Sequence, residues 1–166
     1  DAQSCRLVDV VIAVDPSGSM EEELIAMRND VFPAFAERLL AISDDLDNFR
    51  VATLAACPLP ANFHAVGASG ACDFVGGNVW INSDSENIND EFACVGDIYL
   101  DDIQCSGQND DEQPVSAVIA SLEEPYLSGD NAGFLRDDAL LVVIAITDED
   151  EQSTTMDGAQ ELYNRL

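Results

Sequence analysis

Two long apolar runs dominate the hydrophobic pattern of the chain. Residues 8–14 have the sequence VDVVIAV and residues 139–146 the sequence ALLVVIAI, and both runs are rich in β-branched side chains. Short continuous apolar runs bounded by turn residues are typical of strands buried on both faces of a parallel sheet. Residues 49–56 predict a third strand, and residues 74–81, with Gly76-Gly77 inside them, predict a fourth.

The segments between these strands predict helices. Residues 20–42 carry apolar side chains at helical spacing, with three glutamates in the first turn, where the helix dipole favours negative charge. Pro33 lies within this stripe and should kink or divide the helix. Residues 88–95, 114–122 and 157–166 predict three further helices. Strands and helices that alternate in this way indicate an α/β fold, with a parallel sheet covered on both faces.

The length of 166 residues, 47% of them hydrophobic, is enough for one compact core and too short for two. We therefore expect residues 1–166 to form a single domain. The chain begins at Asp1 without a signal segment, and no stretch approaches the roughly 20 apolar residues of a membrane span. We expect a mature or excised piece of a longer protein, with no membrane insertion.

The charge is far from balanced. The chain has 33 Asp and Glu residues, six Arg and no lysine, which gives a formal net charge of -27. Nucleic acid and anionic membrane surfaces are therefore not expected as partners, because both require a basic face. The acidic residues are spread along the chain and should mostly be solvated, so the fold should favour salt or divalent cations that screen or bind them.

The cysteines indicate disulfides rather than zinc. There is no CxxC pair, and His64 is the only histidine, so a structural zinc site is poorly supported. Disulfides imply an oxidising compartment, and we expect a secreted or cell-surface location. The alternative is that all the cysteines are buried thiols. The five are Cys5, Cys57, Cys72, Cys94 and Cys105.

Proximity along the chain suggests the pairs Cys57 with Cys72 and Cys94 with Cys105. Other pairings remain open, because spacing alone does not fix connectivity. Cys5 is then the cysteine whose partner lies elsewhere.

Oxygen-bearing side chains follow both apolar strands. Asp15 comes directly after residues 8–14 and is followed at two-residue spacing by Ser17 and Ser19, while Asp148 follows the later strand. The carboxyl ends of parallel strands meet at one edge of an open sheet, so Asp15 and Asp148 should converge there. Oxygen ligands without His or Cys suit a hard cation such as Mg²⁺ or Ca²⁺. The alternative for the segment DPSGSM is a turn with a helix cap.

These residues resemble a known family. VDVVIAVDPSGSM resembles the opening strand and Asp-x-Ser-x-Ser loop of von Willebrand factor A (vWA) domains, which carry a metal-ion-dependent adhesion site, and LLVVIAITDEDE resembles the later strand ending in that site's Thr-Asp. Cys94, Cys105 and the Glu-Gln-Pro sequence at 112–114 resemble a secreted bacterial branch of the family. The resemblance implies a doubly wound, mostly parallel, Rossmann-like sheet flanked by helices, with the metal at its carboxyl edge.

The resemblance also implies a ligand set. Ser17 and Ser19 would coordinate the ion directly, while Asp15 and Asp148 would hold it directly or through water. The family leaves one coordination position for a carboxylate of a partner. The ion would be Mg²⁺ or Ca²⁺, with Mn²⁺ as a further option.

The sequence departs from the family pattern at two places. The family's middle ligand is usually a Thr, and counting back from Ala117 places Glu112 there, with Gln113 beside it. Glu112 or Gln113 could ligate the metal, or the role could pass to Ser106 or a water. The family also continues with another strand and helix after the single helix that follows Asp148, so this chain is either a fragment or one edge strand short.

Together these features predict an extracellular adhesion module that binds a protein or glycan partner through the divalent cation. The alternative is an acidic matrix or surface-layer domain whose metal only staples the loops. An enzyme is not expected: a phosphotransferase with Asp15 as nucleophile would normally use a lysine, and a hydrolase triad would depend on His64 alone. Residues 97–111 could bind calcium but lack an EF-hand loop.

Overall fold

The strands form a four-stranded sheet in the order β5-β2-β1-β6 in the computed structural model, which describes residues 6–42, 46–57, 59–98, 112–151 and 164. β1 pairs in parallel with both β2 and β6, and β5 pairs antiparallel with β2. The predicted α/β fold with a mostly parallel sheet is confirmed. The strands are β1 (Leu7–Val14), β2 (Asn48–Ala55), β5 (Ile81–Asn82) and β6 (Leu140–Ile146).

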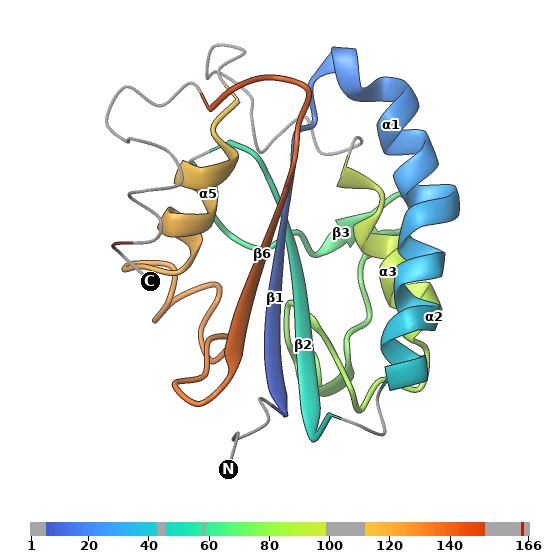
Figure 1. Cartoon of the computed structure of the whole chain (residues 1–166), viewed down its shortest axis with the longest axis vertical. Helices are drawn as coiled ribbons and strands as arrows, with labels where there is room; N and C mark the ends of the chain where they lie inside the picture. Colours follow the sequence, from blue (N-terminus) through green and yellow to red (C-terminus); the bar gives the residue numbers. More distant parts are fainter. Residues whose placement is uncertain (1–5, 43–45, 58, 99–111, 152–163, 165–166) are drawn as a thin grey trace.

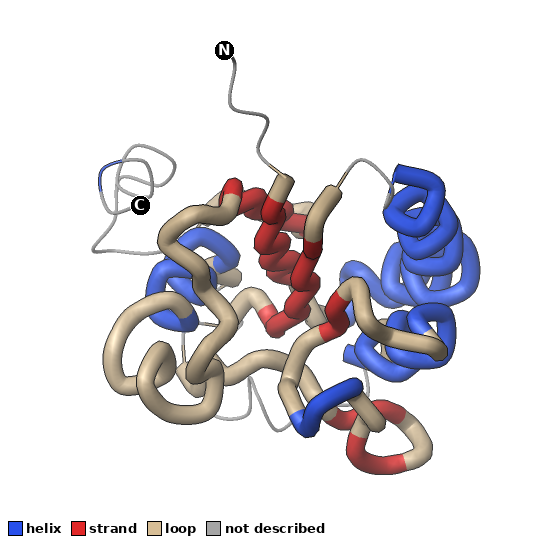
Figure 2. The backbone as a smooth tube through the Cα atoms, turned by 90° about the horizontal axis from the view of Figure 1, so that it is seen from below, coloured by secondary structure: helices blue, strands red, loops and turns tan. Residues whose placement is uncertain are grey.

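Helices cover both faces of this sheet (Figure 1). Seen from below, the strands stand between α5 on one side and the other three helices on the opposite side (Figure 2). Side chains alternate along a strand, so Val10 and Ile12 of β1 enter one core and Val11 and Ala13 enter the other. The helices are α1 (Glu21–Ala26), α2 (Phe32–Ile42), α3 (Ile88–Val95) and α5 (Pro114–Ser121).

Pro33 divides the first helical region, as predicted. A 3-10 turn at Gly18–Met20 leads into α1, and a π-helical turn at Met27–Val31 separates α1 from α2. The N–H of Phe32 donates to the carbonyl of Met27, five residues back. Because Pro33 has no N–H of its own, the ladder cannot continue with regular α-helical bonds through this point, and the wider turn falls directly before it.

The predicted strand at 74–81 is wrong. Val75–Gly77 forms a 3-10 turn, and only Ile81–Asn82 at the end of the segment joins the sheet as β5. Gly76 and Gly77 have φ values of 79° and 70°, a left-handed conformation that breaks an extended chain. A small hairpin that was not predicted, β3 (Val66–Gly67) and β4 (Gly70–Ala71), precedes this turn.

β6 forms as predicted, but its burial differs from the expectation. It lies at the edge of the described sheet, and Leu140 is 47% exposed while most other β6 side chains are half-buried. Apolar composition predicts a strand without giving the number of its neighbours, and a strand at the edge of the described sheet is less covered than the predicted strand buried on both faces. Of the predicted helix at 157–166, only Asn164 lies within the described residues, and it is helical.

The disulfide pairing predicted from spacing is wrong. Cys72 is bonded to Cys94 with Cα atoms 5.8 Å apart, and Cys57 is also disulfide-bonded, whereas Cys5 and Cys105 lie outside the described residues. The pairing follows from packing, because α3 lies against the β3–β4 hairpin: a Cβ added to Gly67 would stand 2.8 Å from Cys94 Sγ. Disulfides are confirmed, and the alternative of five thiols is excluded.

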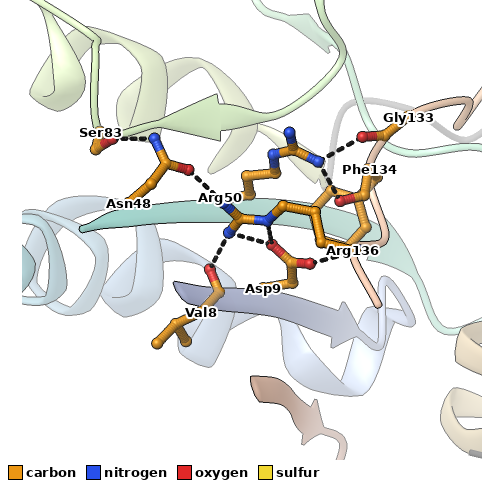
Figure 3. Close-up of polar contacts among 8 residues, drawn as sticks. All are labelled: Val8, Asp9, Asn48, Arg50, Ser83, Gly133, Phe134 and Arg136. Atoms are coloured by element: carbon orange, nitrogen blue, oxygen red, sulfur yellow. Dashed lines mark hydrogen bonds and ion pairs between the residues drawn. The ribbon is translucent and has the colours of Figure 1, made fainter. Parts of the chain in front are cut away.

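A buried ion pair joins the start of β1 to the segment that enters β6 (Figure 3). Arg136 donates from Nε and Nη2 to Asp9 Oδ1 at 2.9 and 2.6 Å, and its backbone N–H donates to Oδ2 at 3.0 Å. Its remaining donors reach Asn48 Oδ1 and the Val8 carbonyl. Asp9 is fully buried and the Arg136 side chain is 15% exposed. This carboxylate inside an apolar strand was not predicted from the sequence.

No described helix is long and apolar enough to cross a membrane.

Asp9→Asn should lower the free energy of unfolding by about 3 kcal/mol, because it leaves the Arg136 guanidinium largely buried without a counter-charge. Urea denaturation measures the change. Asp47→Asn is the matched control, since Asp47 pairs with Arg6 on the surface, where such pairs contribute less than about 1 kcal/mol. Equal losses in the two variants would contradict the structural role given to Asp9.

Replacing Cys72 and Cys94 together by Ala should cost about 3 kcal/mol of stability, since the bond closes a loop with a sequence separation of 22 residues and restricts the unfolded chain. Peptide mapping of the unreduced protein should recover a peptide that links Cys72 to Cys94. A peptide that links Cys57 to Cys72 would show that the pairing is different.

Candidate metal site

Asp15 is the buried centre of the candidate site. It follows the last residue of β1, it is fully buried, and its N–H donates to the Ile146 carbonyl at 2.9 Å, so the ends of β1 and β6 stay paired. Its Oδ1 accepts from the Ser17 N–H at 2.8 Å, and its Oδ2 accepts from Thr147 Oγ1 at 2.9 Å. The carboxylate is therefore oriented by one donor on each oxygen.

Two serine hydroxyls connect Asp15's loop to the end of β6. Ser17 Oγ and Ser19 Oγ lie 2.9 Å apart, and Ser19 Oγ donates to Asp148 Oδ1 at 3.3 Å. The structure thus brings together the residues that the sequence predicted to converge from two strands: Asp15, Ser17, Ser19 and Asp148. Their role as metal ligands stays a prediction.

The turn of the alternative interpretation forms, with the Ser17 N–H bonded to Asp15 Oδ1, but its side-chain helix cap does not. Ser17 lies at the N-cap of the 3-10 turn, but its side chain makes no capping bond, and the N-cap of α1 is Met20. The hydroxyls of Ser17 and Ser19 instead contact each other and Asp148. These hydroxyls therefore bond toward the end of β6 and leave the free N–H groups of the helix without a side-chain cap.

Glu112, the first candidate for the middle ligand, is 5% exposed. Burial raises the pKa of the Glu112 carboxyl, and the negative charges of Asp15 and Glu149 raise it further. The adjacent Gln113 donates its N–H to the Ala56 carbonyl at 2.8 Å, which ties this segment to the end of β2. Ser106, the other candidate for the middle ligand, lies outside the described residues.

The atoms at this edge that could ligate a metal are all oxygens, and a hard divalent cation prefers oxygen ligands. Over the described ranges, no three or more His, Cys, Asp or Glu side chains converge closely enough to hold a metal ion by themselves. A site here would therefore need the hydroxyls of Ser17 and Ser19 as ligands beside the carboxylates.

Glu151 contributes to this region and was not predicted from the sequence. Its Oε2 accepts from the Val115 N–H at 2.7 Å and its Oε1 from Ser116 Oγ at 2.8 Å, so it closes the start of α5. A signal was available: α5 begins with proline and has no acidic residue in its own first turn. The free N–H groups there favour a carboxylate from elsewhere in the chain.

His64 and Trp80 belong to the core. His64 is 1% exposed, and its backbone N–H donates to the Thr53 carbonyl at 2.7 Å, in β2. Trp80 is 6% exposed and packs edge-on against Phe134, with ring centroids 5.7 Å apart. Both side chains are therefore part of the packed interior.

Comparison of the chain with protein-family models, with characterised proteins and with solved structures found no match.

Glu151→Ala should lower the free energy of unfolding by about 1–2 kcal/mol, because it leaves the Val115 N–H and the Ser116 hydroxyl without their charged acceptor. Urea denaturation gives the loss, and amide exchange at Val115 should become faster. Glu151→Gln, which keeps one acceptor oxygen, should lose less. Unchanged exchange at Val115 in the alanine variant would show that this cap does not form.

Proposed function

We propose that this chain is an extracellular binding module of the vWA type, which recognises a protein or glycan partner through a divalent cation. The observation that carries the proposal is the hydrogen-bonded convergence of Asp15, Ser17, Ser19 and Asp148 from two strand ends. These residues lie at the carboxyl edge of parallel strands, where open α/β sheets bind their ligands. The proposal includes the fold of that family, a doubly wound, Rossmann-like sheet.

The chemistry of the donors favours Mg²⁺ or Ca²⁺, with Mn²⁺ as a substitute. Asp15 supplies a buried carboxylate whose oxygens are already oriented, and Ser17 and Ser19 supply hydroxyls nearer the surface. A bound cation would provide positive charge on a protein whose net charge is -27. An acidic group of a partner could then bind at a surface that would otherwise repel it.

The disulfides support the proposed location. Cys72–Cys94 and the bonded Cys57 fit a protein that folds in an oxidising compartment, as secreted and surface proteins do.

A second candidate function is favoured by one observation, the burial of Glu112 beside Asp15. Burial is the main cause of the raised pKa of Glu112, and the charge of Asp15 raises this pKa further. If Glu112 became an additional ligand, it could fill the position that a partner's carboxylate would occupy. The domain would then be a structural one whose metal only joins the loops.

Chelation should lower the melting temperature of the wild type at constant high ionic strength, and one divalent cation should restore it. An ion bound only by the native state at 100 times its Kd stabilises by about 2.7 kcal/mol. Asp15→Ala should lose the part of this response that comes from the ion at Asp15, and so should Ser19→Ala, which removes only an exposed hydroxyl and should leave the core intact. Asp130→Ala, a change at an exposed loop carboxylate, is the control and should respond like the wild type.

An unchanged cation response in both Asp15→Ala and Ser19→Ala would rule out this site. Where the response is lost, water relaxation with Mn²⁺ separates the two candidate functions. A rapidly exchanging water on the ion leaves room for a partner and supports adhesion. An ion without exchangeable water supports the structural role.

A further inference from the structure

A second acidic region lies between the β3–β4 hairpin and the start of α3. Two cavities of about 230 Å³ each flank the side chain of Glu91, and Asp73 and Asn87 also line both of them. None of the described lining residues is basic. The carboxylates around the two cavities are Asp73, Asp84, Glu86, Asp90 and Glu91.

Glu91 differs from the other acidic residues there because it is 4% exposed. It occupies the apolar stripe of α3, whose buried members are Ile88, Phe92 and Val95. The Ser85 hydroxyl and the Val75 N–H hydrogen-bond to its carboxylate. Its Oε2 is buried and has no hydrogen-bond partner in the part of the chain that the structure describes. A buried carboxylate oxygen of this kind is costly unless something binds it.

The electrostatic environment of Glu91 favours a positive ligand. Burial raises the pKa of Glu91, the two hydrogen bonds lower it, and the charge of Asp73 raises it further. A cation between Glu91 and Asp73 would turn their repulsion into two attractions. The chain offers no lysine for this purpose, and its arginines are not among the lining residues.

Among cations, the surroundings suit calcium. All the polar side chains of the cavity walls offer oxygen ligands, from carboxylates, from the Asn87 amide and from the Ser69 hydroxyl. Ca²⁺ accepts six to eight oxygens in flexible geometry, whereas Mg²⁺ requires a near-ideal octahedron. Since no three carboxylates converge among the described residues, carbonyl oxygens and waters would complete the coordination.

We propose that Glu91 and Asp73 form a calcium site that is separate from the site at Asp15. The site joins the loop that follows β4 to the first turn of α3. Cys72 and Cys94 line one of the two cavities, so the ion and the disulfide secure the same excursion of the chain. The proposal does not depend on the function of the Asp15 site.

Calcium binding is measured by titration calorimetry and thermal unfolding after chelation, at constant high ionic strength. Glu91→Gln, which keeps the shape of the side chain, should bind one Ca²⁺ fewer than the wild type and show a smaller Ca²⁺-dependent rise in melting temperature. In chelator it should be at least as stable as the wild type, because the buried charge is gone. Glu37→Gln, which removes an exposed charge on α2, should behave like the wild type.

The Asp15→Ala and Ser19→Ala variants keep the two sites distinguishable. Both variants should retain the calcium ion at Glu91. The double variant Ser19→Ala with Glu91→Gln should lose this ion. Asp73→Asn, a change at the cavity wall, should also weaken this binding. It is the variant to measure if Glu91→Gln does not fold. Wild-type calcium stoichiometry in Glu91→Gln, or in Asp73→Asn where that variant is the one measured, would overturn the proposal, whatever happens at Asp15.

Discussion

The parallel register of β1 and β6 is the constraint on which the candidate site depends. Val14 pairs with Ile146, so Asp15 and Thr147 leave their strands at the same level and their side chains meet. At the other end, the Asp9–Arg136 ion pair fixes the segment that enters β6 against β1. A slip of one residue would turn the β6 side chains to the opposite faces and separate these groups. The polar contacts at the two ends therefore specify the register of β1 and β6, which the apolar side chains between them do not determine.

Three buried carboxylates show how an acidic chain accommodates charge in its interior. Asp9 has a complete partner in Arg136, and both oxygens of Asp15 accept hydrogen bonds from neighbouring loops. Glu91 has donors from Ser85 and Val75 but keeps one oxygen without a described partner. With six arginines for 33 acidic residues, ion pairing can serve few of them. The remaining buried carboxylates need hydroxyls, backbone donors or a bound cation.

The fold and the core of the candidate site could be predicted because they follow from local patterns. Apolar runs define the strands, and the topology of parallel strands brings Asp15 and Asp148 to one edge. Disulfide pairing could not be predicted, because the bond of Cys72 with Cys94 depends on how α3 packs on the hairpin. The glycine pair at 76–77 is itself a signal against a strand, because both glycines adopt positive φ values that an extended chain does not have.

Glu91 shows a signal that the sequence does contain. It lies at helical spacing between apolar residues, three after Ile88 and four before Val95, and all three are buried. A carboxylate within an apolar stripe must be neutralised, hydrogen-bonded or bound by a ligand. Spacing alone cannot choose among these outcomes, because the choice depends on Asp73 and on the cavities that the hairpin creates beside it. Burial of a charged group can therefore be anticipated from periodicity, whereas its partner emerges only when distant segments are packed together.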